Sequence, residues 1–142
     1  MSSILINYLG LDVGDRRIGV AIANNQAKLA SPLITLDRLK EDDIVSSIKK
    51  IANDNNIKMV IVGLPRGMSG QETEQTIKNR QFAGLVEKAL KMPVYLQDEA
   101  GTSLKAKDEL SLKNKNYQKS DVDKLAATYI LQDWIDNTWR DN

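Results

Sequence analysis

The sequence predicts an α/β protein in which helices flank a mixed five-stranded sheet. Residues 59–64 (MVIVGL) form an uninterrupted apolar run, the pattern of a strand that is buried on both faces. Three apolar stretches precede this run and are separated by polar turns, which is typical of an antiparallel meander. Helical stripes then alternate with strands, so the expected order is β-β-β-α-β-α-β-α.

The meander occupies the first quarter of the chain. Its first strand is expected at residues 4–13, and the turn at residues 14–17 leads back into a second strand at residues 18–23. The third strand, at residues 29–36, contains Pro32. Because proline cannot donate a ladder hydrogen bond, we place this strand at a sheet edge or at a bulge.

The helices are predicted from apolar side chains that recur at helical spacing. Ile44, Ile48 and Ile51 define one stripe, and three acidic residues precede it, as the helix dipole favours. A second helix is expected at residues 71–91, with Phe82, Leu85, Val86 and Ala89 in the core. A short strand at 93–99 and a last helix at 121–134 follow, separated by a polar stretch at 111–119.

Composition excludes several kinds of chemistry. The chain has 142 residues, which suits one domain spanning residues 1–142. It contains neither histidine nor cysteine, so a catalytic triad, a thiolate nucleophile and a zinc–histidine site are all excluded. The net charge of +1 means that nucleic-acid binding must depend on local basic patches. No apolar run approaches the roughly 20 residues of a membrane span, and we expect a cytoplasmic protein.

An acidic residue, Asp12, interrupts the first apolar strand. A carboxylate in a buried strand is costly unless something pairs with it. It could cap the turn or pair with Arg16 or Arg17, it could belong to a phosphate loop, or it could bind a metal. The glycine spacing matches neither the GxxxxGK[ST] phosphate loop nor the GxGxxG dinucleotide fingerprint.

Two further pairs of acidic residues, which with Asp12 make three acidic stations, lie where the predicted sheet order brings them near Asp12. Asp98 and Glu99 end the last strand, and Asp121 and Asp123 open the last helix. Ligands in such sheets gather at the carboxyl ends of the strands. Carboxylates at this edge suit Mg²⁺ or Mn²⁺, and two such ions can activate water for phosphodiester cleavage without histidine or cysteine.

Each station also has a structural interpretation. Asp98 and Glu99 could simply end a strand, and since their side chains alternate, we expect only one of them to face the site. The segment SDVD at residues 120–123 resembles a capping box, with Ser120 as the cap and Asp123 at the third helical position. Capping and metal binding are compatible roles for Asp123.

Basic side chains could hold a nucleic-acid backbone beside these acids. Candidates in the turns and loops are Arg16, Arg17, Arg66, Lys113, Lys115 and Lys119. The loop at residues 65–70 precedes a helix and could present its amides to a phosphate, or it could be a plain connection with Ser69 as the helix cap.

Five motifs in order resemble the YqgF/RuvX family over nearly the whole chain. They are GLDVGDRRIGVAI, SPL, VIVGLPRGMSG, the DE that precedes Thr102, and VDKLAATYILQDWI. The first motif also opens sugar kinases and chaperone ATPases, but the combination is specific. The resemblance implies an RNase H-like fold and an enzyme that matures the precursor of small-subunit ribosomal RNA, or one that resolves Holliday junctions.

The resemblance also implies roles for single residues. Asp12, Glu99 and Asp123 would be the catalytic acids, and these three with Asp98 would hold Mg²⁺ or Mn²⁺. One position departs from the family pattern, because Ala100 stands where the family usually has arginine. We therefore expect a metal-dependent endonuclease that acts on structured nucleic acid and processes the 5′ end of pre-16S rRNA in ribosome biogenesis. The alternatives are a Holliday junction resolvase and a catalytically weakened nucleic-acid-binding module.

Overall fold

The computed structural model describes residues 4–99, 102–113 and 116–139. The strands are β1 (Asn7–Val13), β2 (Arg17–Asn24), β3 (Ser31–Asp37), β4 (Ile57–Pro65) and β5 (Val94–Glu99). The helices are α1 (Ile44–Asp54), α2 (Glu74–Leu90), α3 (Thr102–Lys113) and α4 (Lys119–Thr138). The predicted α/β class and the order of the strands are confirmed, and α3 is an additional helix.

The strands form one mixed sheet in the order β3-β2-β1-β4-β5. The pairs β1–β2 and β2–β3 are antiparallel, whereas β1–β4 and β4–β5 are parallel. Pro32 lies in β3 at the sheet edge, as its missing N–H group requires. Because β1, β4 and β5 run in the same direction, their carboxyl ends meet at one edge of the sheet.

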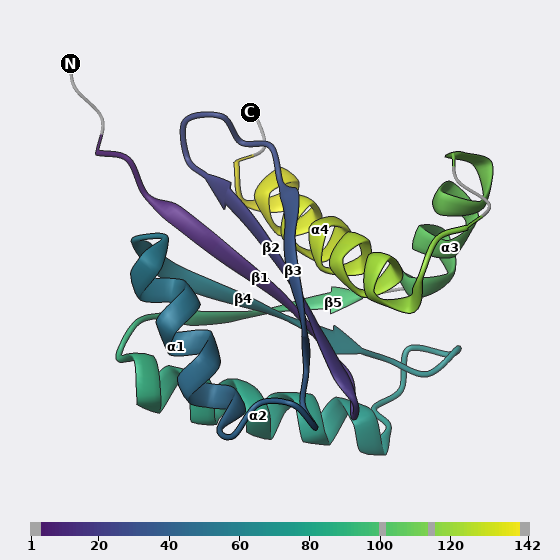
Figure 1. Ribbon diagram of the computed structural model, residues 1–142, viewed down its shortest axis with the longest axis horizontal. Helices are drawn as coiled ribbons and strands as arrows, with labels where there is room; N and C mark the ends of the chain where they lie inside the picture. The colour runs from purple at the N-terminus through teal and green to yellow at the C-terminus, as the bar shows by residue number, and fades with distance from the viewer. Residues whose placement is uncertain (1–3, 100–101, 114–115, 140–142) are drawn as a thin grey trace.

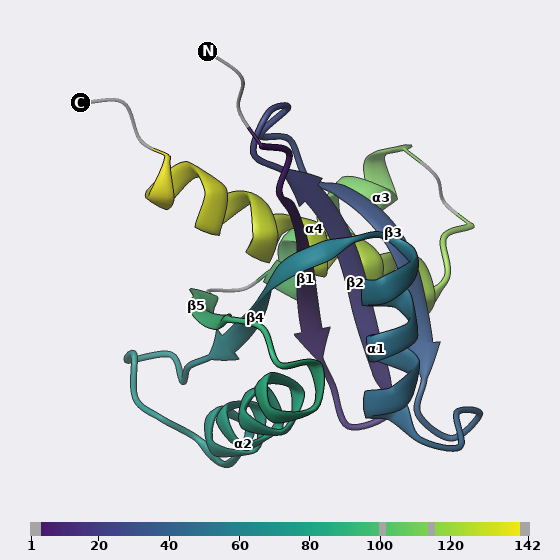
Figure 2. The same ribbon diagram turned by 90° about the vertical axis from the view of Figure 1, so that its left-hand side faces the viewer.

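Helices cover both faces of the sheet (Figures 1 and 2), with α1 and α2 on one face and α4 on the other. Alternation along β1 divides its side chains between the two cores. Leu9, Leu11 and Val13 pack with α1 and α2, whereas Tyr8 packs with α4. This period of two places Asp12 on the α4 face.

Glycines let α4 approach the sheet closely. A Cβ atom at Gly10 of β1 would lie 2.7 Å from the Cβ of Leu131. One at Gly19 of β2 would lie only 1.9 Å from the carbonyl oxygen of Asp123. The start of α4 therefore packs directly on the β2 backbone, which fixes where the side chains of its first turns point.

Helix caps agree with the sequence at α1 and differ at α2. Asp43 caps α1, and its carboxylate accepts hydrogen bonds from the backbone N–H groups of Val45 and Ser46. Thr73, rather than Ser69, caps α2 through a capping box with Thr76. The core stripe of α2 is also shifted, because Leu85 is 57% exposed, and Ala83 is buried beside Phe82 and Val86.

The polar stretch predicted at residues 111–119 is partly helical. Helix α3 extends to Lys113 and packs against α4 through a small core around Ala106, Val122 and Ala126. Figure 1 shows α3 projecting to one side of the sheet, attached along the start of α4. Among the described residues, no helix combines the length and the apolar character that crossing a bilayer requires.

Candidate active site

Asp12 lies near the carboxyl end of β1, and its partner across the antiparallel ladder is Gly19. Burial, and secondarily the negative charge of Asp123, raises the pKa of Asp12 to about 7. Neither arginine of the neighbouring turn neutralises it, because Arg16 binds Asp37 and Arg17 binds Asp123. The interpretation of Asp12 as an ion-pair partner for these arginines is therefore wrong.

Glu99 is the last residue of β5 and faces the same side of the sheet. Its Oε2 atom is buried and has no hydrogen-bond partner within the described residues. A Cβ at Gly63 of β4 would lie 2.3 Å from this oxygen, so the carboxylate occupies the space above a glycine. Burial, and then the charge of Asp12, raises the pKa of Glu99 to about 8. We call Asp12 and Glu99 the acidic pair.

Asp98 is directed away from the acidic pair. Its side chain is 68% exposed and accepts hydrogen bonds of 3.3 Å from Arg66. The alternation expected along the strand therefore leaves Glu99 as the residue of the DE motif that faces Asp12.

Asp123 lies in the first turns of α4 and binds an arginine. Arg17 donates from Nε to Oδ2 of Asp123 over 2.5 Å, and both side chains are partly buried. Asp123 does not cap the helix, because α4 begins at Lys119 and Asp121 accepts the hydrogen bond from the N–H of Gln118. The capping interpretation of Asp123 is therefore wrong, and Asp121 has that role.

The acidic pair can supply oxygen ligands to a hard divalent cation. Within residues 4–99, 102–113 and 116–139, no three Asp, Glu, His or Cys side chains converge closely enough to hold a metal ion. The pair still fits such an ion, because Glu99 Oε2 is a buried acceptor that no described residue hydrogen-bonds and the two carboxylates repel each other. Asp123 acts on Asp12 electrostatically while it is held by Arg17.

Comparison with known proteins identifies the family. A family model described as "RuvX: Holliday junction resolvase" matches residues 6–137. This chain belongs to the RuvX family. A relative in Clostridium novyi is 38% identical over 134 residues, which cover 93% of this chain and 99% of the relative. One in Chloroflexus aggregans is 36% identical over 132 residues, which cover 90% and 92%. Both relatives carry the name "Putative pre-16S rRNA nuclease".

Solved structures confirm the RNase H-like fold of this RuvX-family chain. Thermus thermophilus RuvC, in complex with a Holliday junction substrate, aligns with a TM-score of 0.59 at 14% identity and covers 94% of this chain and 96% of its own. The fowlpox virus resolvase, in complex with Holliday junction DNA, aligns with a TM-score of 0.61 at 12% identity and covers 95% and 100%. At these identities the likeness concerns the fold alone.

All three predicted nucleic-acid-binding arginines are paired with acids in this RuvX-family structure, and Arg16 and Arg66 are paired outside the acidic pair and Asp123. Arg16 makes a two-pronged contact with Asp37, with distances of 3.0 and 3.2 Å. Arg66 binds both Asp98 and Glu72. These arginines hold the turn and the loop after β4, and a phosphate would have to compete with their carboxylates.

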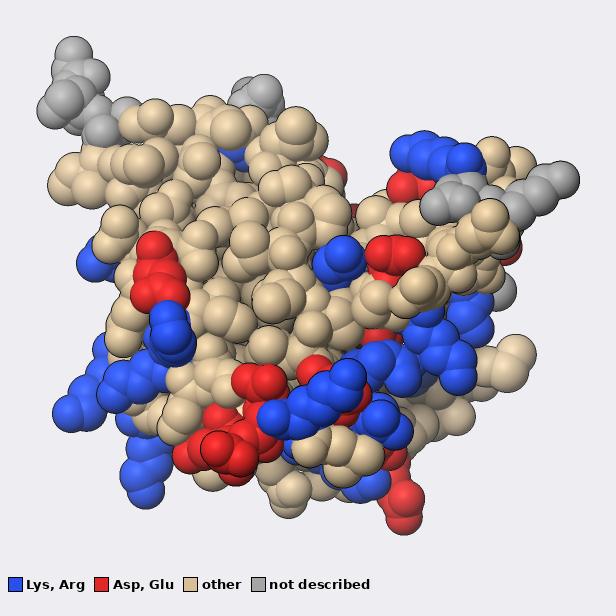
Figure 3. Space-filling model, in the orientation of Figure 1, with Lys and Arg blue, Asp and Glu red and all other residues tan. Residues whose placement is uncertain are grey.

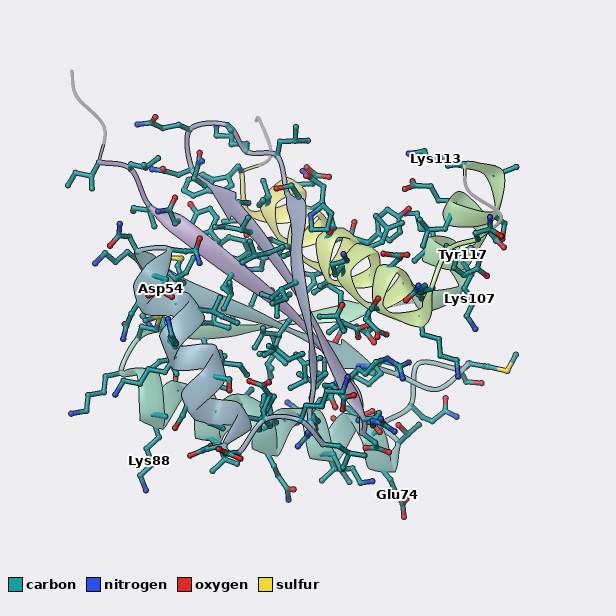
Figure 4. The ribbon with its side chains drawn as sticks, viewed as in Figure 1. Asp54, Glu74, Lys88, Lys107, Lys113 and Tyr117 are labelled. Carbon is teal, nitrogen blue, oxygen red and sulfur yellow. The ribbon has the colours of Figure 1, made fainter. Side chains whose placement is uncertain are left out.

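The predicted lysines differ from one another in their surroundings. Lys113 lies 3.6 Å from Glu109 and, in Figure 4, projects from the tip of α3. Lys115 and the departure at Ala100 lie outside the described residues. Lys119 lines a cleft with Arg17 beside Asp123. The structure therefore brings two of the six predicted basic residues together next to a predicted acid.

Lys107 also lines this cleft, and the sequence analysis did not single it out. It lies in α3, within a stretch of alternating lysines and acids that is typical of a solvated surface. Lys107 could have been predicted as a site residue only if residues 102–113 had been predicted to form a helix that packs on α4.

The contact between Arg17 and Asp123 is expected to stabilise the fold more than an exposed ion pair does. In a double-mutant cycle of Arg17→Gln and Asp123→Asn, we expect a coupling energy of about 1–2 kcal/mol, because the pair is partly buried and hydrogen-bonded. Urea denaturation of the four proteins measures it. The same cycle on Lys50 and Asp54, whose side chains are 77% and 59% exposed, should give about 0.5 kcal/mol or less. Equal couplings would contradict the expected difference.

Proposed function

We propose that this chain is a divalent-metal-dependent endonuclease that hydrolyses phosphodiester bonds of structured nucleic acid. The observation that carries the proposal is the acidic pair, two mutually repelling carboxylates at the edge where β1 and β5 end. Carboxylates with pKa values displaced by burial and by a neighbouring charge are typical of functional sites. Membership of the RuvX family supports the same activity.

The chain's own residues account for metal binding and for positioning. Asp12 and Glu99 would hold Mg²⁺ or Mn²⁺ through carboxylate oxygens, and Asp123 would complete the ligand set once it is released from Arg17. When bound, such an ion lowers the pKa of water and stabilises the charge on the leaving oxygen. Gly63 leaves room for the Glu99 carboxylate, and the packing of α4 on Gly19 places Asp123 beside β1 and β2.

The substrate that we propose is precursor 16S rRNA, cut at its 5′ end. Two relatives that align over nearly their full lengths carry the name "Putative pre-16S rRNA nuclease", which supports the RNA but does not specify the end. With this role in ribosome biogenesis, we propose that the protein acts in the cytoplasm. The second candidate substrate is branched DNA, which is favoured by the description of the family model. Both substrates would use the same acids.

The experiment compares these substrates directly. Purified protein is incubated with labelled precursor 16S rRNA and, in parallel, with a four-way DNA junction, with Mg²⁺, with Mn²⁺ or with a chelator. We expect metal-dependent cleavage near the mature 5′ end of the RNA, and none with the Asp12→Asn protein. Preferential cleavage of the junction would show that branched DNA, and not precursor rRNA, is the substrate. If both nucleic acids bind but neither is cut, the protein is a binding module and the proposed activity is wrong.

A further inference from the structure

A basic cleft lies between α3, the start of α4 and the first residue of β2. It is lined by Arg17, Lys107, Lys119, Val122 and Asp123 and has a volume of about 340 Å³. Liquid water occupies about 30 Å³ per molecule, so the space corresponds to roughly ten waters. A phosphate group with part of its sugar fits into such a volume. Figure 3 shows basic side chains gathered on this side of the molecule, below α3.

The lining carries an excess of positive charge. Three of the five lining residues are cations, and Asp123 is the one carboxylate among them. That carboxylate is already bound to Arg17. Lys107 and Lys119 have no carboxylate partner within the described part of the chain, unlike Lys113, which pairs with Glu109. Both ammonium groups are therefore available to an anion from outside.

A second cleft of similar size shows what distinguishes the basic cleft. It measures about 360 Å³ and is lined by Arg38 and Lys78, among others. There Arg38 donates to the carbonyl of Gly14 and lies over the ring of Phe82, and Lys78 faces Asp15 at 3.7 Å. Its cations already have partners within the protein, so an anion gains less by binding there.

We propose that the basic cleft is a phosphate-binding subsite in which Lys107 and Lys119 hold one backbone phosphate of the nucleic acid next to the bond that is cut. This inference rests on the proposed function and assigns positioning roles to the two lysines. The position of the cleft supports it, because Asp123 lines the cleft and its backbone packs against Gly19, which is the ladder partner of Asp12 in the acidic pair. A strand whose phosphate occupies the cleft is thereby held beside the acids.

The subsite also gives Arg17 two alternative partners. A phosphate in the cleft competes with the Asp123 carboxylate for the Arg17 guanidinium, which binds phosphates and carboxylates in the same geometry. Binding of the substrate then draws Arg17 away from Asp123, and that carboxylate becomes free to face Asp12. Removing the charge of Asp123 should accordingly strengthen phosphate binding.

The test measures binding without cleavage. The Asp12→Asn protein is titrated with fluorescein-labelled single-stranded RNA and with branched DNA, in chelator, over a series of salt concentrations. Adding Lys107→Gln or Lys119→Gln should weaken binding about fivefold at low salt and reduce the slope of log K against log[salt] by about 0.7 for single strands. Lys88→Gln, on α2 far from the cleft (Figure 4), removes the same charge and should change neither quantity. Equal effects of all three substitutions would overturn the subsite.

Two further arms separate the possible outcomes. Adding Asp123→Asn should tighten RNA binding about threefold, and weaker binding would contradict the competition for Arg17. Inorganic phosphate should compete with RNA for the protein and lose this effect when both lysines are replaced. If phosphate binds through the two lysines but their replacement leaves the affinity for RNA unchanged, the cleft is a small-anion site and the nucleic-acid assignment is wrong. Absence of cleavage by the wild-type protein overturns the proposed function but leaves these binding results interpretable.

Discussion

The Asp12→Asn protein should lose metal-dependent cleavage by about 10³-fold or more and yet be more stable than wild type at pH 8 in chelator. A metal-held carboxylate contributes several kcal/mol to stabilising the transition state, and each 1.4 kcal/mol corresponds to about tenfold in rate. The same carboxylate is an unfavourable charge in the metal-free fold. Activity and stability should therefore change in opposite directions.

The direction of the stability change follows from the pKa values. Folding raises the pKa of Asp12 from 3.8 to about 7 and that of Glu99 from 4.5 to about 8. The folded state therefore binds protons more tightly than the unfolded state, and stability falls as the pH rises between about 4 and 8. Asparagine carries no charge at any pH in this window, so Asp12→Asn should remove the part of this loss that comes from Asp12. The part that comes from Glu99, whose pKa is raised first by burial and only then by the charge of Asp12, should largely remain.

We expect a gain of about 2 kcal/mol at pH 8, or about 5 °C in Tm, because one pKa unit corresponds to about 1.4 kcal/mol and relaxation around the pair reduces the full effect. Thermal denaturation at pH 5 and pH 8 measures it, and the gain should be less than half as large at pH 5, which lies above the unfolded-state pKa of 3.8 and below the folded-state pKa of about 7. Mg²⁺ should raise the Tm of the wild type more than that of the variant. Asp54→Asn, which removes an exposed acid of α1 (Figure 4), is the matched control and should show no such pH-dependent gain. A variant less stable than wild type at pH 8 would contradict the burial of Asp12.

The strands were predictable because their signals are local. The continuous apolar run at residues 59–64 predicts a strand that is buried on both faces. Helix α3 gives no comparable signal, because its lysines and acids alternate and only Ala106 is fully buried among its described side chains. Its position depends on packing against α4, which is a tertiary contact that periodicity does not encode.

The acidic residues of the candidate site could be predicted from the sequence, but the residues that bind them could not. The order of the strands places Asp12 and Glu99 at one edge, and alternation along β5 selects Glu99 over Asp98. The contact of Arg17 with Asp123 spans 106 positions in the sequence. It depends on how α4 lies across β2, and that depends on the space above Gly19.

Replacing Gly19 by alanine should therefore cost the most stability of the single substitutions at the site. The added Cβ would lie 1.9 Å from the carbonyl oxygen of Asp123 and 2.3 Å from its carbonyl carbon. Both atoms belong to the α4 backbone, so the helix must move as a unit to make room. We expect a loss of about 3 kcal/mol or more in the free energy of unfolding, with weakened contact between Arg17 and Asp123.

Two other glycines make this prediction specific. Gly63→Ala also crowds its site, but it meets the Glu99 carboxylate and the Cδ1 of Ile130, which are ends of side chains and can turn away. It should cost less stability than Gly19→Ala while still lowering cleavage, because Glu99 is displaced.

Gly84→Ala, in α2, meets nothing within 4 Å and should stabilise the protein by about 1 kcal/mol, the helix preference for alanine. Urea denaturation of the three variants measures the order. If Gly19→Ala is as stable as wild type, α4 does not rest on β2 at this glycine, and the placement of Asp123 beside Asp12 fails with it.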